Sequence, residues 1–192
     1  MVIITPLPPG HGVRFLKRRD MTDTLLALST DRCRITPLFA DDARALSAIT
    51  DEMVTSQVHF LPAPFTEADA RALIAGSGGG DVFHAVRDES GLDLNGVIGV
   101  HRRIGQEYEI GYWFAARARG KGIATEAVRA VVGALASSRP GCSIIAECHP
   151  DNERSRALLR RIGFVSTGRA GKRPGRMLMA WRAAPAWRID VC

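Results

Sequence analysis

Two motifs in the C-terminal half of the chain constrain its fold more than any other feature. The first, Arg119-Gly120-Lys121-Gly122-Ile123-Ala124, opens one helical pattern, and the second, Asn152-Glu153-Arg154-Ser155, opens another that ends at Ile162-Gly163-Phe164. Small residues and free backbone amides at a helix N-terminus let an anionic pyrophosphate lie against the main chain. The sequence therefore indicates a domain that binds a nucleotide-like ligand.

Length and composition indicate one globular domain. The chain has 192 residues, of which 46% are hydrophobic, which suffices for one core and does not favour two. Residues 1–28 begin with several prolines and glycines, turn basic and show no long apolar periodicity, so we expect a flexible N-terminal extension. We expect the domain over residues 29–183 and a C-terminal tail over residues 184–192.

Several classes of protein are not indicated by the sequence. No apolar run approaches the ~20 residues that span a bilayer, and residues 1–10 lack the basic region that opens a secretory signal. The four cysteines show no Cys-x-x-Cys spacing, and no second Cys/His cluster completes a zinc site. We expect a cytoplasmic protein with reduced thiols, no bound metal and no membrane partner.

The net charge of +6 is spread over several short basic stretches. These stretches are not interleaved with aromatic residues, which make up only 6% of the sequence. A primary function in nucleic-acid binding is therefore not favoured. Attraction of an anionic ligand, such as a polyphosphate, accounts for the sign of the charge equally well.

Apolar periodicity and turn residues predict the order of helices and strands. The expected strands cover residues 32–38, 82–87, 97–100, 107–114 and 143–149. The expected helices begin at the acids Asp41-Asp42, at the Thr66–Asp69 capping box, at the glycine run and at Asn152. A closing hairpin is expected over residues 165–183. Mixed helices and strands without an internal repeat indicate one α/β or α+β domain.

Each helix is expected to turn one face toward the core. The expected inward residues are Ala45, Leu46 and Ile49 in the first helix, Leu73 and Ile74 in the second, Ile123, Ala127, Val131 and Leu135 in the third, and Ser155, Leu158, Leu159 and Ile162 in the last. Gly163 is a natural C-terminal cap for the last helix. The hairpin turn is expected to hold Gly171, Pro174 and Gly175.

The order of these motifs closely resembles the GNAT superfamily of acetyl-CoA-dependent N-acetyltransferases. The resemblance is carried by the strand Glu109-Ile110-Gly111-Tyr112-Trp113, the Arg119–Ala124 run, a further strand, Asn152-x-x-Ser155 and Gly163-Phe164. Residues 30–38, with Asp41-Asp42-Ala43, are similar to the start of the RimJ/RimL branch, so the likeness covers roughly residues 28–182. It implies a mixed, mostly antiparallel sheet flanked by helices, with a splayed strand pair at the CoA site.

The resemblance also implies which residues lie along acetyl-CoA. The family's Arg-x-x-Gly-x-Ala pattern is matched by Arg119, Gly122 and Ala124, so backbone amides there are expected to bind the pyrophosphate. The implied CoA-site residues are Trp113, Phe114, Arg119, Gly120, Lys121, Gly122, Ile123, Ala124, Thr125, Asn152 and Ser155. A plainer interpretation stays open, in which Asn152 only caps a helix and Ser155 only completes its first turn.

One position departs from the family pattern. Many members have a tyrosine five residues before the phenylalanine of the Gly-Phe pair, where it protonates the departing thiolate, and this chain has Leu159 there. A thiol has a pKa near ~8.5, so the CoA sulfur must regain a proton from Ser155, from water or from another side chain. By position, Ser155 is our candidate for this acid.

A carboxylate is expected to assist the attacking amine. Glu109, on the strand just before the glycine run, is our first choice as base or water-orienting residue. Glu147 and His149, spaced two apart on the next strand, are alternatives. For all three residues a structural ion pair or a solvated position stays open.

The predicted function is direct acetyl transfer from acetyl-CoA to an amine, without an acyl-enzyme intermediate. The acceptor is a protein N-terminal α-amine or a small amine or amino acid. Residues 51–65 are expected to shape the acceptor site, with Phe60 and Phe65 as an apolar wall and Glu52 as an amine anchor. Two alternatives stay open: a non-catalytic acyl-CoA-binding or regulatory domain, and a basic protein that interacts with RNA or the ribosome. A homodimer is also left open.

Overall fold

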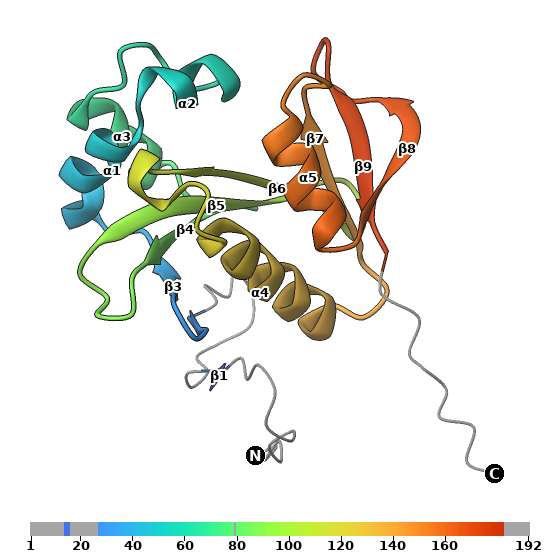
Figure 1. The fold of residues 1–192 in the computed structure, drawn as a ribbon, viewed down its shortest axis with the longest axis horizontal. Coiled ribbons are helices and arrows are strands. Elements are labelled where there is room, and N and C mark those ends of the chain that lie inside the picture. Colours follow the sequence, from blue (N-terminus) through green and yellow to red (C-terminus); the bar gives the residue numbers. More distant parts are fainter. Residues whose placement is uncertain (1–13, 16–26, 79, 183–192) are drawn as a thin grey trace.

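The computed structural model describes residues 14–15, 27–78 and 80–182 (Figure 1). Most of the expected N-terminal extension, and all of the expected tail over residues 184–192, lie outside the described residues. Leu28, the last residue assigned to that extension, is buried in the core. None of the helices in the described ranges is long and apolar enough to cross a membrane.

A mixed sheet forms the centre of the molecule. Its described strands are β1 (Arg14–Phe15), β2 (Leu28–Ser29), β3 (Arg34–Pro37), β4 (Asp81–Arg87), β5 (Leu94–Arg102), β6 (Glu107–Phe114), β7 (Ser143–Cys148), β8 (Phe164–Ala170) and β9 (Met177–Trp181). They lie in the order β1-β2-β3-β4-β5-β6-β7-β9-β8, and β6–β7 is the parallel pair among otherwise antiparallel neighbours. The prediction of a mixed, mostly antiparallel sheet is confirmed.

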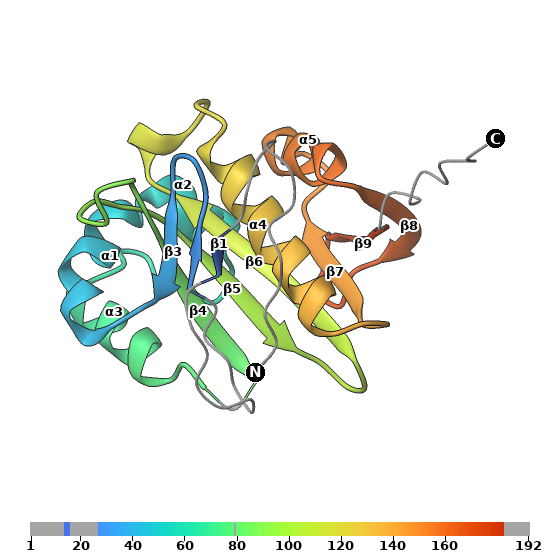
Figure 2. The ribbon, with the colours of Figure 1, turned by 90° about the horizontal axis from the view of Figure 1, so that it is seen from below.

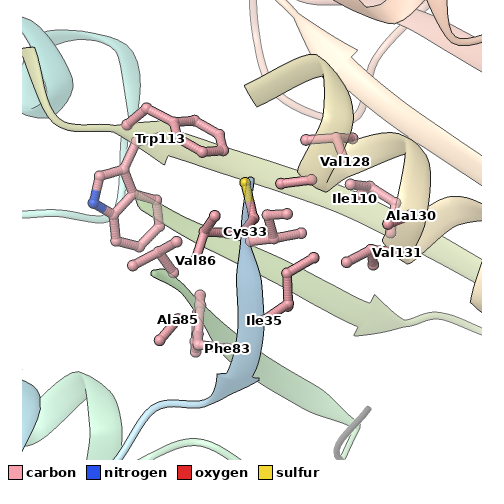
Figure 3. Close-up of a cluster of buried hydrophobic side chains, with 14 of the residues drawn as sticks. Cys33, Ile35, Phe83, Ala85, Val86, Ile110, Trp113, Val128, Ala130 and Val131 are labelled. Carbon is pink, nitrogen blue, oxygen red and sulfur yellow. The ribbon is translucent and has the colours of Figure 1, made fainter. Parts of the chain in front are cut away.

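Helices cover both faces of the sheet. They are the short 3-10 helices η1 (Ala40–Asp42) and η2 (Ala116–Ala118) and the helices α1 (Ala43–Ile49), α2 (Glu52–Gln57), α3 (Glu67–Ala75), α4 (Ile123–Ser138) and α5 (Glu153–Arg161). In Figure 1, α1, α2 and α3 lie above the sheet and α4 lies below it, and Figure 2 shows α4 from that lower side. Figure 3 shows Val128 and Val131 of α4 facing the β-strand residue Ile110.

The local sequence explains most of these elements. The predicted stripe of α4 is confirmed, since Ala127, Val131 and Leu135 are buried and Ile123 packs against the core. The capping box of α3 is present, because Thr66 and Asp69 bond each other's backbone N–H. Gly163 follows α5 with a φ of 101°, a left-handed conformation that favours glycine.

One expectation for the N-terminal helices is wrong, and one short helix was not expected. Ala45 is exposed, and Ala43 is buried in its place. Residues 43, 46 and 49 repeat every three positions along α1, and residue 45 lies about 100° around the helix from Leu46. Helix α2 was not expected, because six residues are too few for an apolar stripe. Asp51 starts it by accepting a hydrogen bond from the N–H of Val54 (2.9 Å).

The parallel strands β6 and β7 diverge along their length. Their pairing joins Glu107, Tyr108 and Glu109 to residues 143–145 and extends no further. Residues 110–114 of β6 continue beyond this point without β7 alongside, although they remain paired with β5. The expected splayed strand pair is therefore present, and it opens the sheet at the ends from which α4 and α5 begin.

A buried histidine in the core predicts a pH-dependent stability. His84 on β4 is 2% exposed, and burial lowers its pKa to about 4. Neither ring nitrogen has a hydrogen-bond partner within the described part of the chain. Between pH 6.5 and 4 the unfolded chain binds a proton that the folded chain does not. The free energy of unfolding should thus fall by about 3 kcal/mol over this range from His84 alone. In chemical denaturation, the free energy of unfolding of His84→Leu should depend less on pH than that of the wild type. An equal pH dependence in the two proteins would contradict this role of His84.

Candidate functional site

A cleft opens where β6 and β7 separate. The segment between α2 and α3 and the segment between β8 and β9 form other walls of this cleft. Its lining comprises residues 57–60, Phe83, Gly99, His101, residues 109–113, residues 146–148, Asn152, Ser155, Leu159, Arg173 and Arg176. The carboxyl ends of parallel strands lie at the same edge of a sheet, so the helices that follow β6 and β7 both begin near this opening.

The start of α4 presents free backbone amides. Gly120 and Gly122 have φ angles of 76° and 79°, in the left-handed region, and Gly122 is the N-cap. Glu126 is the first residue whose N–H bonds back into the loop, to the carbonyl oxygen of Gly122 (3.1 Å). The N–H groups of Ile123, Ala124 and Thr125 therefore have no acceptor within the helix. Such a turn can hold an anion.

The side chain of Arg119 fastens the loop before α4 to two neighbouring segments. Its Nε donates to the carbonyl oxygen of Phe114 (3.0 Å), and its Nη2 pairs with both carboxylate oxygens of Asp51 (3.0 and 2.9 Å). Burial opposes ionisation of Asp51, but the hydrogen bonds from Arg119 and Val54 N–H keep its pKa below the usual range. The arginine of the motif thus ties the loop to the start of α2 and leaves anion contacts to the main chain.

A second ion pair braces the same helix end. Glu126 lies in the first turn of α4 and accepts hydrogen bonds from the Thr30 hydroxyl (2.6 Å) and from Arg32 Nε (2.7 Å). Arg32 Nη1 also donates to the carbonyl oxygen of Lys121 (2.8 Å). Arg32 therefore neutralises an acid that would repel an anion at this helix end. No local pattern predicts the pairing of Arg32 with Glu126, because the two residues lie 94 positions apart.

The start of α5 serves two purposes. Asn152 Oδ1 accepts a hydrogen bond from the N–H of Ser155 (3.1 Å), so the capping interpretation holds. Its Nδ2 also donates to Gln57 Oε1 (3.3 Å) across the cleft. Both Asn152 and Ser155 line the opening as well, so these residues cap the helix and also lie on the wall of the cleft.

Tyr112 is a site residue that the sequence reasoning missed. Its hydroxyl lies 3.0 Å from the Oγ of Ser155, and it lines the cleft from β6. Burial raises the pKa of Tyr112, so its hydroxyl keeps its proton at neutral pH. Leu159 fills the position of the missing family tyrosine and is 1% exposed. A phenol is therefore present beside Ser155, but it comes from another element.

Trp113 and Phe114 point to opposite faces of β6, as neighbouring strand residues do. Trp113 lines the cleft and donates from Nε1 to the Thr50 hydroxyl (3.1 Å) at the end of α1. Phe114 packs in the core, where a side chain at Gly96 would collide with its ring. Phe114 does not line the cleft, although its carbonyl oxygen holds Arg119.

Two buried carboxylates share one arginine at the inner end of the cleft. Glu109 pairs with Arg103 (2.9 Å) and with Arg173 (2.5 Å), and Glu147 pairs with the same Arg173 Nη1 (3.0 Å). Burial alone would raise the pKa of Glu109, but the hydrogen bonds from Arg173 and Arg103 outweigh it and lower this pKa. Glu109 is therefore ionised and a weak proton acceptor.

Glu147 also fastens the β8–β9 connection. Its carboxylate accepts hydrogen bonds from the backbone N–H groups of Lys172 (2.6 Å) and Arg173 (3.2 Å). These contacts give the buried Glu147 carboxylate a structural function. His149 lies beyond the end of β7, near Asp151, and is not among the residues that line the cleft.

The expected acceptor segment contributes in part. Gln57, Val58, His59 and Phe60 line the cleft, and Phe60 is partly exposed. Phe65 is buried in the core, and Glu52 is exposed on α2, and neither lines the cleft. The apolar wall therefore consists of Phe60 with Phe83, whose ring centroids lie 6.2 Å apart.

Removal of Arg173 should unbalance the two carboxylates. In Arg173→Met, Glu109 and Glu147 stay buried with less positive charge beside them, and loss of one partner of a buried pair costs about 3 kcal/mol of unfolding free energy. Chemical denaturation at pH 7 measures this loss. Arg169→Met, at an exposed position of β8, is the matched control and should change stability little. Equal stabilities of the two variants would contradict this account of the cluster.

No group of three or more His, Cys, Asp or Glu side chains that could hold a metal ion occurs in the described part of the chain.

The profile of the acetyltransferase (GNAT) domain matches residues 32–165. The chain is 38% identical over 89 residues to YdaF of Bacillus subtilis (strain 168), which is named as a ribosomal N-acetyltransferase. That alignment covers 43% of this chain and 48% of YdaF, so the chain spans about half the length of this curated relative.

Solved structures agree in fold. A GNAT-family acetyltransferase from Bacillus anthracis superimposes with a TM-score of 0.70 at 26% identity, over 81% of this chain and 96% of its own. RimL, a ribosomal L7/L12 α-N-protein acetyltransferase solved with coenzyme A, gives a TM-score of 0.69 at 16% identity, over 78% and 93% of the chains. With the family profile matched over most of the described residues, the chain belongs to the GNAT acetyltransferase family.

Proposed function

We propose that this protein transfers the acetyl group of acetyl-CoA directly to an amine. One observation supports this most strongly: β6 and β7 separate between the start of α4, whose first amides have no acceptor within the helix, and the Ser155–Tyr112 hydroxyl pair at the start of α5. The first can hold the pyrophosphate of CoA, and the second can serve its sulfur. RimL, which shares this fold, was solved in complex with coenzyme A.

The diverging strand offers a place for the thioester. Residues 110–114 of β6 have lost β7 as a neighbour, so the backbone groups on that edge are free to bond a ligand. A backbone N–H there can stabilise the negative charge that develops on the carbonyl oxygen during attack. Gly111 keeps this stretch open, because it brings no side chain into the cleft.

We assign the acceptor end to the α2–α3 side of the cleft. Glu109 is ionised between two guanidinium groups, so its role is to orient water or the incoming amine. An α-amine, with a pKa near 7.7–8.0, is partly neutral at pH 7, whereas a lysine-like amine near 10.4 is mostly protonated. Together with the ribosomal N-acetyltransferase names of its relatives, this favours a protein N-terminal α-amine as acceptor.

The pyrophosphate site predicts a selective effect at Gly122. Gly122→Trp places a side chain at a left-handed φ, with its Cβ 3.2 Å from Arg32 Nη2, and should block CoA from the α4 amides. We expect acetyl-CoA affinity to fall at least ~100-fold, the equivalent of two lost charge-assisted hydrogen bonds. Isothermal titration calorimetry measures this affinity.

Gly105→Trp is the matched control for this experiment. Gly105 has a similar φ of 76° but stands in open space on the β5–β6 turn, and acetyl-CoA affinity should be retained. Full affinity in Gly122→Trp would overturn the proposed pyrophosphate site. RNA binding that survives in Gly122→Trp, with no acetylated product from the wild type, would support the ribosome-interacting alternative instead.

The hydroxyl pair predicts coupled losses of activity. Ser155→Ala removes the proposed acid and should lower kcat about 100-fold, within the usual range for general acid catalysis. Tyr112→Phe keeps the ring and removes the hydroxyl that supports Ser155, and should lower kcat about 10-fold. Because both groups act on one proton, the double variant should be no slower than Ser155→Ala. Steady-state kinetics in which the double variant showed the combined loss of kcat of both single variants would show that the two residues act independently.

A further inference from the structure

His101 lies in the cleft on the same face of the sheet as Glu109. The two residues are directly opposed in the β5–β6 register, and Gly99 is opposite Gly111 two positions further along. A Cβ at Gly99 would lie 2.5 Å from His101 Nε2, and one at Gly111 would lie 3.8 Å away. Glycine at 99 therefore makes the room that the imidazole occupies, and Nε2 points along the strand toward Gly111.

Asp81 fixes the orientation and the proton of this ring. Its Oδ1 accepts a hydrogen bond from His101 Nδ1 (2.9 Å) across the β4–β5 pair. Arg103 Nη1 lies 3.5 Å from the same oxygen, so this carboxylate lies between the ring and a guanidinium group. With Nδ1 protonated, a neutral ring carries its lone pair on Nε2. Phe83 packs against the ring edge to face, with centroids 5.3 Å apart, and limits its rotation.

The other basic groups of the cleft are already engaged. Glu109 is held by Arg103 and Arg173. His59 Nε2 accepts a hydrogen bond from Arg173 Nε (3.3 Å). By contrast, His101 Nε2 has no hydrogen-bond partner among the described residues, and the ring lines the cleft. A nitrogen lone pair is therefore available to a substrate at this point.

We propose that His101, positioned by Asp81, is the base that accepts the proton of the attacking amine. The inference rests on the acetyl transfer proposed above. As the amine nitrogen bonds to the thioester carbonyl carbon, its proton passes to Nε2 of His101. The C–S bond then breaks, Ser155 gives its proton to the sulfur and regains one from water, and His101 releases its proton to water. The products are the N-acetylated amine and CoA thiol.

The charges around His101 suit this role. Burial lowers its pKa, the hydrogen bond and the charge of Asp81 raise it part of the way back, Arg103 lowers it and Glu109 raises it. The net result is a pKa below the usual value of a histidine. His101 is thus neutral at pH 7 and can accept a proton, and its protonation should produce the acidic limb of the pH profile of kcat/KM.

The first test removes the imidazole. With acetyl-CoA and an N-terminal peptide, His101→Ala should lower kcat at least ~100-fold and leave the KM for acetyl-CoA unchanged. Added imidazole should restore part of the activity, because the vacated space beside Gly99 can admit it. A merely structural histidine would not give such rescue. His149→Ala, outside the cleft lining, is the matched control and should keep wild-type kcat.

Two further variants secure the interpretation. His101→Gln fills the space without a base, so it should also be slow while calorimetry shows wild-type affinity for acetyl-CoA. Asp81→Asn should lower kcat less than His101→Ala and move the acidic limb to lower pH. A His101→Gln enzyme within two-fold of wild type, or loss in His101→Ala without imidazole rescue, would overturn the assignment. A wild-type protein that acetylates no amine would overturn the acetyl transfer itself.

Discussion

The divergence of β6 and β7 is the constraint on which the rest of the site depends. Two parallel strands that separate after three paired residues expose main-chain groups on one edge and direct two helix starts to it. A fully paired β6 would use the same groups in the sheet and leave no opening for a thioester. The start of α4 and the hydroxyls beside α5 flank this single break in pairing.

Ion pairs between distant segments give the opening its shape. Arg119 ties the α4 loop to Asp51, and Arg32 from the β2–β3 turn covers Glu126. At the other end Arg173 brings the β8–β9 connection onto Glu109 and Glu147. Several of the basic residues thus hold carboxylates in place between segments that are distant in the sequence.

Local sequence signals were sufficient for elements that depend on the backbone. The bounds of β6, the capping box at Thr66 and the glycine start of α4 were predicted correctly, because each depends on residues within one or two turns. Helix α2 and the burial of Ala43 in place of Ala45 on α1 were not, because both depend on packing rather than on periodicity. The sites of Tyr112 and His101 were not predicted for the same reason. Tertiary contacts bring Tyr112 to Ser155, and strand pairing brings His101 to Asp81.

Residue type and spacing alone indicated the family, the two helix starts and the absence of the family tyrosine at position 159. These features can be recognised without knowing which strands are neighbours. The surroundings of each candidate catalytic group, by contrast, follow from the tertiary structure. Tyr112 lies beside Ser155, Glu109 is paired with two arginines, and the Nε2 of His101 has no hydrogen-bond partner among the described residues. Charge and proton affinity depend on neighbours brought together by strand register and burial, and a linear sequence does not specify those distances.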